Sequence, residues 1–299
     1  MNTKKEKIIA VVGPTASGKS ALGVEIAERY EGEIISADSR QVYSGLDIGS
    51  GKITKDEMKG IPHHMLDMAD PMDTYSVSDF VREATFALED ILRRNKIPLI
   101  VGGTFFYSDA LIYGWDLPEV PPNQILREEL ESMTLEELVE MLEEKDTLYS
   151  ERVDTENKRR VIRALEIIEA GESLEPLQKE SPYDVLWVGI ETDETLRVRI
   201  EERFDARIKG GMIEEVERLL VQGVTYSRLQ ELGLEYAHIS SYLLGKIDKE
   251  EMKETILSKS WQYSRRQLTW LRKNKNIEWF PLSKKEEIFI RVGAFLHNI

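Results

Sequence analysis

Residues 13–20 combine residue types that suit the binding of a phosphate group. They read Gly-Pro-Thr-Ala-Ser-Gly-Lys-Ser, directly after an apolar run and directly before a stretch with helical periodicity. The glycines let the backbone bend closely around an anion, so N–H groups and the N-terminus of the next helix can point at phosphate oxygens. Lys19 would add a positive charge, and the Ser20 hydroxyl could bind Mg²⁺. The segment predicts a polyphosphate site, with an unoccupied tight turn as the alternative, and it identifies neither the ligand nor the reaction.

Three further polar residues are candidates for the same site. Asp38 follows the second apolar run, and a carboxylate there could hold Mg²⁺ or act as a general base. Thr104 ends a Gly-Gly-Thr turn after the third run, and Arg203 lies on a predicted helix from which it could reach a polyphosphate. Because ligands of an open parallel sheet lie beyond the carboxyl ends of its strands, we expect these residues near the phosphate-binding segment. The alternatives are a helix cap, a simple turn and an i,i+4 ion pair, respectively.

The composition excludes several classes of protein. The chain has 299 residues, a net charge of −15 and no cysteine, which excludes disulfides and thiolate metal sites. A metal site at His63-His64 is not favoured, since no cysteine or acid lies at ligand spacing, so local packing or a substrate hydrogen bond is preferred. No apolar run approaches the roughly 20 residues of a membrane span, and the first residues lack a signal peptide's apolar stretch. We therefore expect a cytoplasmic protein without a membrane partner.

The charges are unevenly distributed. Acidic residues are concentrated in residues 119–151, whereas residues 258–277 contain no acid and interleave lysines and arginines with Trp261, Tyr263 and Trp270. The net negative charge argues against nucleic-acid binding, but binding depends on the local field. A basic face that carries aromatic side chains fits an RNA or polyphosphate surface, and a solvated helix face is the alternative.

The apolar pattern predicts a doubly wound α/β sheet. Four short apolar runs are typical of buried parallel strands: Ile8–Val12, Glu33–Ser36, Pro98–Val101 and Val185–Ile190. Apolar residues at three- and four-residue spacing predict helices at Phe80–Arg93 (capped by Ser78 or Asp79), Leu196–Gln222 (interrupted at Gly210-Gly211) and Lys249–Lys273. The pattern predicts no element for residues 277–299.

A helical segment interrupts the α/β pattern. Prolines at 118, 121 and 122 mark a boundary, and the sequence from there to about Gly171 is helical, glutamate-rich and too long for a connection inside a compact sheet domain. We therefore predict a P-loop NTPase-like parallel sheet with flanking helices, formed by residues 1–116 and 183–299. Residues 117–182 are expected to form an inserted all-helical domain.

Seven segments, in order over nearly the whole chain, resemble the tRNA dimethylallyltransferases, also called tRNA isopentenyltransferases. They are GPTASGKS (13–20), ISADSRQVYSGLDIG (35–49), IPHHMLDMADPMDTYSVSDF (61–80), VGGT (101–104), RRVIRALEI (159–167), RIEERFDARI (200–208) and RRQLTWLR (265–272). This match is far more specific than the phosphate-binding segment alone. The chain departs from the usual family pattern at Ser50-Gly51-Lys52-Ile53, Phe105-Phe106-Tyr107 and Leu232-Gly233-Leu234. These departures do not fall on Lys19, Ser20, Asp38 or Arg203, so they bear on the fine placement of the site and leave the reaction class intact.

The resemblance implies transfer of the dimethylallyl group from dimethylallyl diphosphate to N6 of adenosine 37, which is 3′-adjacent to the anticodon, in tRNAs that read codons beginning with U. It implies Asp38 as the general base at N6, Lys19, Thr104 and Arg203 as catalytic groups at the diphosphate, and Ser20 as the ligand of an Mg²⁺ cofactor. The implied diphosphate-binding residues are Gly13, Pro14, Thr15, Ala16, Ser17, Gly18, Lys19 and Ser20. The implied tRNA-binding residues are Asp38, Ser39, Arg40, Gln41, Thr104, Arg127, Arg159, Arg160, Val161, Ile162 and Arg163.

The inserted domain would then bind the anticodon stem-loop, and we expect the enzyme to be a monomer. Three other functions stay open at the level of sequence. A small-molecule kinase or ATPase is suggested by the ATP-binding type of loop alone, and prenylation of free AMP or ADP by an adenylate isopentenyltransferase is a close variant. An RNA-binding protein with a vestigial nucleotide fold is the non-enzymatic alternative. ATP hydrolysis would favour the kinase, whereas the inserted domain and the basic helix argue against a free nucleotide as acceptor.

Overall fold

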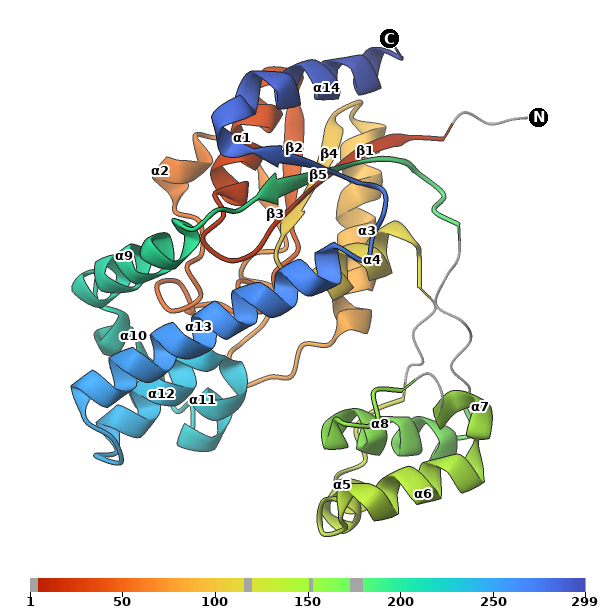
Figure 1. Cartoon of the computed structure of the whole chain (residues 1–299), viewed down its shortest axis with the longest axis vertical. Helices are drawn as coiled ribbons and strands as arrows, with labels where there is room; N and C mark the ends of the chain where they lie inside the picture. Colours follow the sequence, from red (N-terminus) through yellow and green to blue (C-terminus); the bar gives the residue numbers. More distant parts are fainter. Residues whose placement is uncertain (1–4, 116–119, 151–152, 173–179, 299) are drawn as a thin grey trace. The chain divides into compact units, whose positions relative to one another are not determined.

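The computed structural model describes residues 5–115, 120–150, 153–172 and 180–298, and these form two compact units. One unit comprises Met1–Gly114 and Ser181–Ile299, and the other comprises Trp115–Glu180 (Figure 1). The boundaries expected from the sequence lie two residues from these limits. Within the described ranges, no helix is both long and apolar enough to cross a membrane.

The larger unit is built on a six-stranded parallel sheet with the order β3-β2-β4-β1-β5-β6. The strands are β1 (Lys7–Val12), β2 (Gly32–Ser36), β3 (His63–His64), β4 (Ile97–Gly102), β5 (Asp184–Glu191) and β6 (Ile277–Pro281). All four predicted strands are confirmed. The last paired residues of β4 are Gly102 with Val12 of β1 and Val101 with Ser36 of β2, so β4 lies between the two strands that precede the phosphate-binding segment and Asp38.

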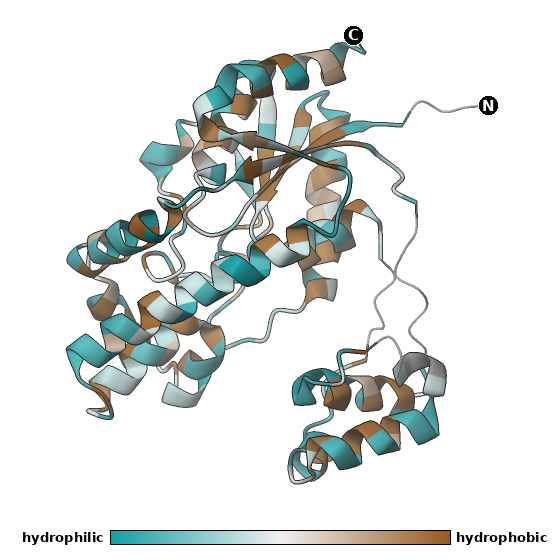
Figure 2. Cartoon of the chain, viewed as in Figure 1, coloured by the Kyte–Doolittle hydropathy of each residue, from teal (hydrophilic) through white to brown (hydrophobic). Residues whose placement is uncertain are grey.

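Helices cover both faces of this sheet. Alternate residues of β1 enter different apolar clusters: Ile8 packs on the side of α3 (Val77–Arg93) and α4 (Phe105–Ile112), and Ile9 on the side of α1 (Lys19–Tyr30) and α14 (Lys285–His297). Figure 2 shows the apolar colour concentrated along these strands. Burial on both faces explains why the strands are continuous apolar runs rather than alternating ones.

One expectation about these elements is corrected, and a segment whose sequence was uninformative proves to be regular structure. The α3 helix begins at Val77 with Ser76 as its N-cap, because the Ser76 hydroxyl accepts the Asp79 N–H while the Asp79 carboxylate accepts the Ser76 N–H. Asp79 is thus the third residue of the helix rather than its cap. Residues 277–297, for which no element was predicted, form β6, a short 3₁₀ turn (Leu282–Lys284) and α14.

A second group of helices packs together within the larger unit. It comprises α9 (Leu196–Lys209), α10 (Met212–Val221), α11 (Tyr226–Leu232), α12 (Leu234–Leu243) and α13 (Lys249–Leu271). A short α2 (Lys55–Met58) instead contacts α1. The predicted break at Gly210-Gly211 is confirmed, since Gly211 has a φ of 96° and separates α9 from α10. The α13 helix packs on α12 and α9 and also contacts α4 (Figure 1). It thereby joins this helical group to the sheet.

The smaller unit is helical, as predicted. It contains α5 (Gln124–Glu131), α6 (Leu135–Lys145), α7 (Thr147–Ser150) and α8 (Lys158–Glu169). Leu130, Leu138 and Leu142 pack against α8 in a separate apolar core. Glu166, only 2% exposed, lies beside this core and accepts hydrogen bonds from Arg127, Arg163 and the Asn123 backbone. The unit therefore has its own stabilising contacts.

Candidate functional site

The phosphate-binding segment forms a loop between β1 and α1 whose shape depends on left-handed backbone. Gly18, with a φ of 91°, is the N-cap residue of the 12-residue α1, and it has no side chain to satisfy the first N–H groups of the helix. Ala16 also has a positive φ, at 59°. The Pro14 carbonyl accepts the Ser17 N–H and the Lys19 ammonium, each at 3.3 Å. The loop thus brings the first N–H groups of α1 and a cation to one place, as an anion site requires.

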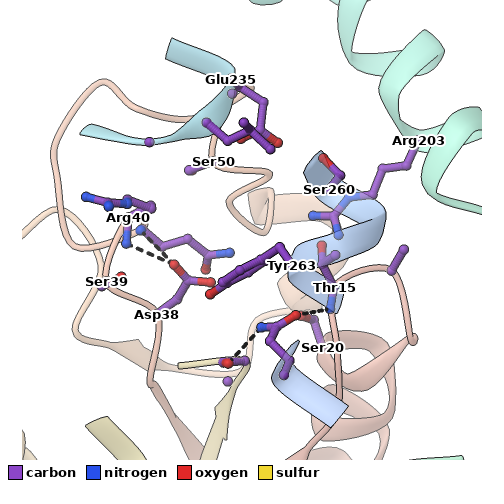
Figure 3. A pocket seen from close by; sticks show the side chains of 18 of the residues that line it. Thr15, Ser20, Asp38, Ser39, Arg40, Ser50, Arg203, Glu235, Ser260 and Tyr263 are labelled. Carbon is purple, nitrogen blue, oxygen red and sulfur yellow. Dashed lines mark hydrogen bonds between the residues drawn. The ribbon is translucent and has the colours of Figure 1, made fainter. Parts of the chain in front are cut away.

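This loop borders a cavity of about 500 Å³ (Figure 3). Its walls come from the residues after β2, from residues 49–53 and from α9, α12 and α13. The residues expected at the site that line it are Thr15, Ala16, Lys19, Ser20, Asp38, Ser39, Arg40, Gln41 and Arg203. The structure therefore brings together the phosphate-binding loop, the candidate base and the candidate arginine.

Asp38 is fixed by the backbone that follows it. Its Oδ1 accepts the N–H groups of Arg40 at 2.9 Å and Gln41 at 3.4 Å, and the carboxylate points toward the Tyr263 ring (Figure 3). Thr104 lies beside it: its backbone N–H donates to the Ala37 carbonyl at 3.2 Å, and its hydroxyl accepts the Ser39 N–H at 3.3 Å. Thr104 therefore ties the turn after β4 to the segment that carries Asp38.

Three cations gather on the other side of the cavity. Burial of Lys19 in the cavity wall and the nearby Arg203 guanidinium lower the pKa of Lys19 to about 8, although the Asp38 carboxylate acts to raise it. Burial and the neighbouring Arg207 likewise lower the pKa of Arg203. Arg203 donates to the Gly51 carbonyl at 3.0 Å, whereas Arg207 donates to Gly49 and forms an ion pair with Glu235 at 2.9 Å.

Neither Lys19 nor Arg203 forms an ion pair in the described part of the chain, so the alternative of helix-surface pairing for Arg203 does not hold in this structure. Cations whose pKa is lowered by a neighbouring cation are stabilised when an anion binds beside them. This corner of the cavity is consequently suited to a polyanion.

Sequence reasoning missed Gln267, which closes the site from α13. Its amide oxygen accepts the Thr15 N–H at 2.9 Å, and its NH₂ group donates to the Gly103 carbonyl at 2.7 Å. The side chain is only 8% exposed, and a Cβ on Gly103 would lie 2.6 Å from its nitrogen. Position 103 therefore has no room for a side chain larger than that of glycine. No local signal marks a single glutamine in a basic helix, because its partners are remote in sequence.

The basic, aromatic stretch forms one stripe of α13. Lys259, Tyr263, Arg266 and Trp270 follow one another at three- and four-residue spacing on the helix, and the first three line the cavity. Lys273 continues this spacing in the turn just after the helix ends. Trp270 is 48% exposed, and the Lys273 ammonium lies 4.4 Å from its ring centroid. The stripe thus leads from the cavity onto the surface.

The residues expected to bind tRNA through the smaller unit lie in four kinds of surroundings. Arg127 and Arg163 are paired with buried Glu166, Arg160 forms an ion pair with Asp154 at 2.8 Å, and Arg159 is exposed. Val161 and Ile162 are 0% and 3% exposed inside the core of the unit. The buried side chains of Val161 and Ile162 stabilise the packing of α8, and this burial fits a structural role better than contact with RNA. The RNA contacts of the four arginines stay predictions.

The histidine pair has local partners. The Glu33 carboxylate hydrogen-bonds His64 Nε2 at 2.8 Å, and the Ile61 carbonyl lies 2.9 Å from His63 Nδ1. His63 also lines the cavity. No group of three or more histidine, aspartate or glutamate side chains in the described ranges could together hold a metal ion.

The sequence is similar to two family models and to many curated proteins. A model described as IPP transferase matches residues 41–274, and one described as isopentenyl transferase matches residues 6–73. A tRNA dimethylallyltransferase of Thermomicrobium roseum is 41% identical over 94% of this chain and 88% of its own length. The tRNA dimethylallyltransferase of Anoxybacillus flavithermus is 39% identical over 98% of this chain and 96% of its own length.

Solved structures agree with these sequence matches. A tRNA isopentenylpyrophosphate transferase from Bacillus halodurans superposes with a TM-score of 0.75 at 37% identity and covers 98% of both chains. A eukaryotic dimethylallyltransferase that was solved acting on tRNA gives a TM-score of 0.81 at 25% identity, over 98% of this chain and 80% of that one. The P-loop NTPase-like fold predicted from the sequence is confirmed.

Proposed function

Since the chain belongs to the IPP transferase family, we propose that it transfers the dimethylallyl group of dimethylallyl diphosphate to N6 of adenosine 37 in tRNAs that read codons beginning with U. The products are N6-isopentenyladenosine and diphosphate. One observation carries the proposal: Asp38 shares a cavity with Lys19 and Arg203, two cations without an ion-pair partner in the described residues. A base and an anion site in one cavity suit a reaction in which a diphosphate leaves while a proton is removed.

The chemistry forms one bond and breaks another. The N6 lone pair of adenine attacks C1 of the dimethylallyl group, the C1–O bond breaks with its electron pair going to diphosphate, and Asp38 accepts the N6 proton. The exocyclic amine is a weak nucleophile because its lone pair is delocalised into the ring. A positioned general base typically contributes about 10²- to 10⁴-fold to such a step. The bonds from Arg40 and Gln41 hold one carboxylate oxygen and keep the other oriented.

The leaving group needs fixed positive partners, because negative charge grows on the diphosphate as the C1–O bond breaks. Backbone carbonyls of the protein hold Lys19 and Arg203, and the fold fixes the N–H groups of the loop, so little reorganisation is needed during the reaction. Gln267 keeps the loop and the Gly103 turn at a fixed separation.

The residues present also fit Mg²⁺. Mg²⁺ prefers oxygen ligands and commonly takes only one or two from the protein, with water and substrate phosphates completing its shell. Ser20 and Asp38 offer a hydroxyl and a carboxylate in the same cavity. Ser20 would hold the ion, which would supply further neutralisation of the diphosphate when bound.

The acceptor is proposed to be tRNA rather than a free nucleotide. A reacting adenosine must leave its stack, which costs a few kcal/mol and less in a single-stranded loop. The exposed stripe of α13 offers cations and an aromatic ring for neighbouring nucleotides. The separate helical unit, with exposed Arg159 and Arg160, would bind the anticodon stem-loop. A cytoplasmic location and a monomeric state belong to the same proposal.

The direct test is a prenylation assay. The purified protein is incubated with Mg²⁺, dimethylallyl diphosphate and unmodified tRNA, and the nucleosides of the digested tRNA are analysed by mass spectrometry. We expect isopentenyladenosine at position 37, and no product when AMP or ADP replaces tRNA. Folded protein that yields no modified tRNA would refute the proposal, and modification of the free nucleotide alone would favour an adenylate isopentenyltransferase.

A further inference from the structure

A buried carboxylate on α10 organises a loop beside the cavity. Glu215 is only 1% exposed. Its Oε2 accepts the backbone N–H groups of Asp47 at 3.0 Å and Ile48 at 2.7 Å. Its Oε1 accepts the Gly49 N–H and the Tyr236 hydroxyl, both at 2.9 Å. Four neutral donors therefore satisfy both oxygens of a carboxylate that would otherwise be costly to bury.

The opposite side of this loop, residues 47–51, carries the acceptors for the two cavity arginines. The Gly49 carbonyl accepts Arg207 at 2.8 Å, and the Gly51 carbonyl accepts Arg203 at 3.0 Å. The Gly51 N–H donates to the Ile48 carbonyl at 3.0 Å, which links a residue held by Glu215 with the residue that holds Arg203. A shift of the N–H groups held by Glu215 would consequently move the carbonyl groups that hold the arginines.

The loop has little room to move independently of these side chains. A Cβ on Gly49 would lie 2.6 Å from the Tyr236 ring, and a Cβ on Gly51 would lie 2.1 Å from the Arg203 guanidinium. Gly51 also has a φ of 63°, in the left-handed region. The backbone of the loop is therefore packed directly against Tyr236 on one side and Arg203 on the other.

We propose that Glu215 is a positioning residue for diphosphate binding, which acts through loop 47–51 to hold Arg203 and Arg207 in place. The inference rests on the proposed function for the identity of the anion. Glu215 itself does not line the cavity. Its contribution is to fix the arginines before the anion arrives, which lowers the cost of ordering them upon binding.

The test replaces the carboxylate by an amide of the same shape. Glu215→Gln has one acceptor oxygen and one NH₂ group, so an N–H donor of the amide must face an N–H donor of the loop. We expect the affinity for inorganic pyrophosphate, measured by calorimetry on the full chain without RNA, to fall about tenfold. We expect kcat for tRNA prenylation to fall by a similar factor while KM for tRNA stays unchanged.

Glu217→Gln is the matched control, because Glu217 is exposed on the same helix, and it should behave as the wild type. A Glu215→Gln enzyme that matches this control in pyrophosphate affinity and kcat would overturn the inference. Wild-type protein that binds pyrophosphate but does not modify tRNA would instead contradict the proposed function, and the pyrophosphate measurement on Glu215→Gln would still be decisive for the inference.

A second measurement separates positioning from general stability. In a background that carries Arg203→Ala and Arg207→Ala, we expect Glu215→Gln to change pyrophosphate affinity by less than about twofold, because interacting sites are not additive. An equal loss in both backgrounds would contradict action through the arginines. If Glu215→Gln does not fold, Tyr236→Phe removes one of the four donors, and pyrophosphate affinity should fall about two- to threefold. An unchanged affinity in that variant would then overturn the inference.

Discussion

The Gln267 amide and the Gly103 carbonyl, 164 residues apart in the chain, are joined by a 2.7 Å hydrogen bond that closes the site. The same amide accepts the Thr15 N–H, so one side chain of α13 connects the phosphate-binding loop with the turn after β4. This connection gives α13 two roles, since its exposed stripe is also the proposed surface for RNA. The separation between the loop and the turn then depends on the packing of α13.

Replacing Gln267 by leucine should impair the site more than the fold. The variant keeps the size of the side chain but leaves the Thr15 N–H and the Gly103 carbonyl without their partner, which costs about 1–3 kcal/mol for each buried group that stays unpaired. We expect kcat/KM for dimethylallyl diphosphate to fall about 10- to 100-fold. Gln222→Leu, at an exposed position after α10, is the control. Equal activity of the two variants would show that the connection is dispensable.

Asp38→Asn should abolish most turnover while binding is retained. Asparagine keeps an acceptor oxygen for the Arg40 N–H but cannot take the N6 proton. We expect kcat for tRNA prenylation to fall about 10²- to 10⁴-fold. The affinity for pyrophosphate, measured by calorimetry, should change little. A parallel loss of affinity and kcat would instead make Asp38 a metal ligand or a structural residue.

The lowered pKa of Lys19 predicts a pH dependence. With a pKa of about 8 in the free enzyme, the Lys19 amine is protonated below that pH and loses its charge above it. Anion binding requires the charged form, and kcat/KM reports ionisations of the free enzyme. We therefore expect kcat/KM for dimethylallyl diphosphate to decline above about pH 8. In Lys19→Arg the decline should disappear, since a guanidinium stays protonated. A decline that persists in this variant would belong to another group.

The helical unit offers a test of stability. Burial opposes ionisation of Glu166, but hydrogen bonds from Arg127, the Asn123 backbone and Arg163 outweigh it and lower its pKa from 4.5. This stabilisation is present above the unfolded value near 4.5 and is lost as the pH falls below it. Glu166→Gln should destabilise the unit by about 1–3 kcal/mol at neutral pH, because the arginines can still reach water. Hydrogen exchange of α5 and α8 measures the change, with exposed Glu169→Gln as control.

The sequence alone was sufficient to predict an element or a site where the residues that define it are neighbours in the chain. The four predicted strands are short, largely apolar runs, and residues 13–20 carry their chemistry in eight neighbouring positions. The sequence was insufficient where the place of a strand depends on contacts with residues remote in the chain. The β3 strand has only two residues, and β6 is an edge strand with partly exposed side chains. No local pattern places β4 between β1 and β2. Glu215 and Gln267 were missed for the same reason, since each acts through partners more than 100 residues away.

The exposed ring of Trp270 on α13 is expected to contribute to RNA affinity. Trp270 has 48% of its surface exposed and carries the Lys273 ammonium over its ring, an arrangement that suits stacking of an unpaired base. Because one stacked base is worth about 1–3 kcal/mol, Trp270→Ala should weaken binding of an anticodon stem-loop about 5- to 150-fold, measured by fluorescence anisotropy. Pyrophosphate affinity should not change. Phe86→Ala, an aromatic residue on α3 that is 66% exposed, is the matched control. Lys273→Ala should in addition reduce the salt dependence of binding by about one ion, since a phosphate contact releases a counterion. If Trp270→Ala binds the stem-loop as well as Phe86→Ala does, the stripe is a solvated helix face and RNA must contact the protein elsewhere.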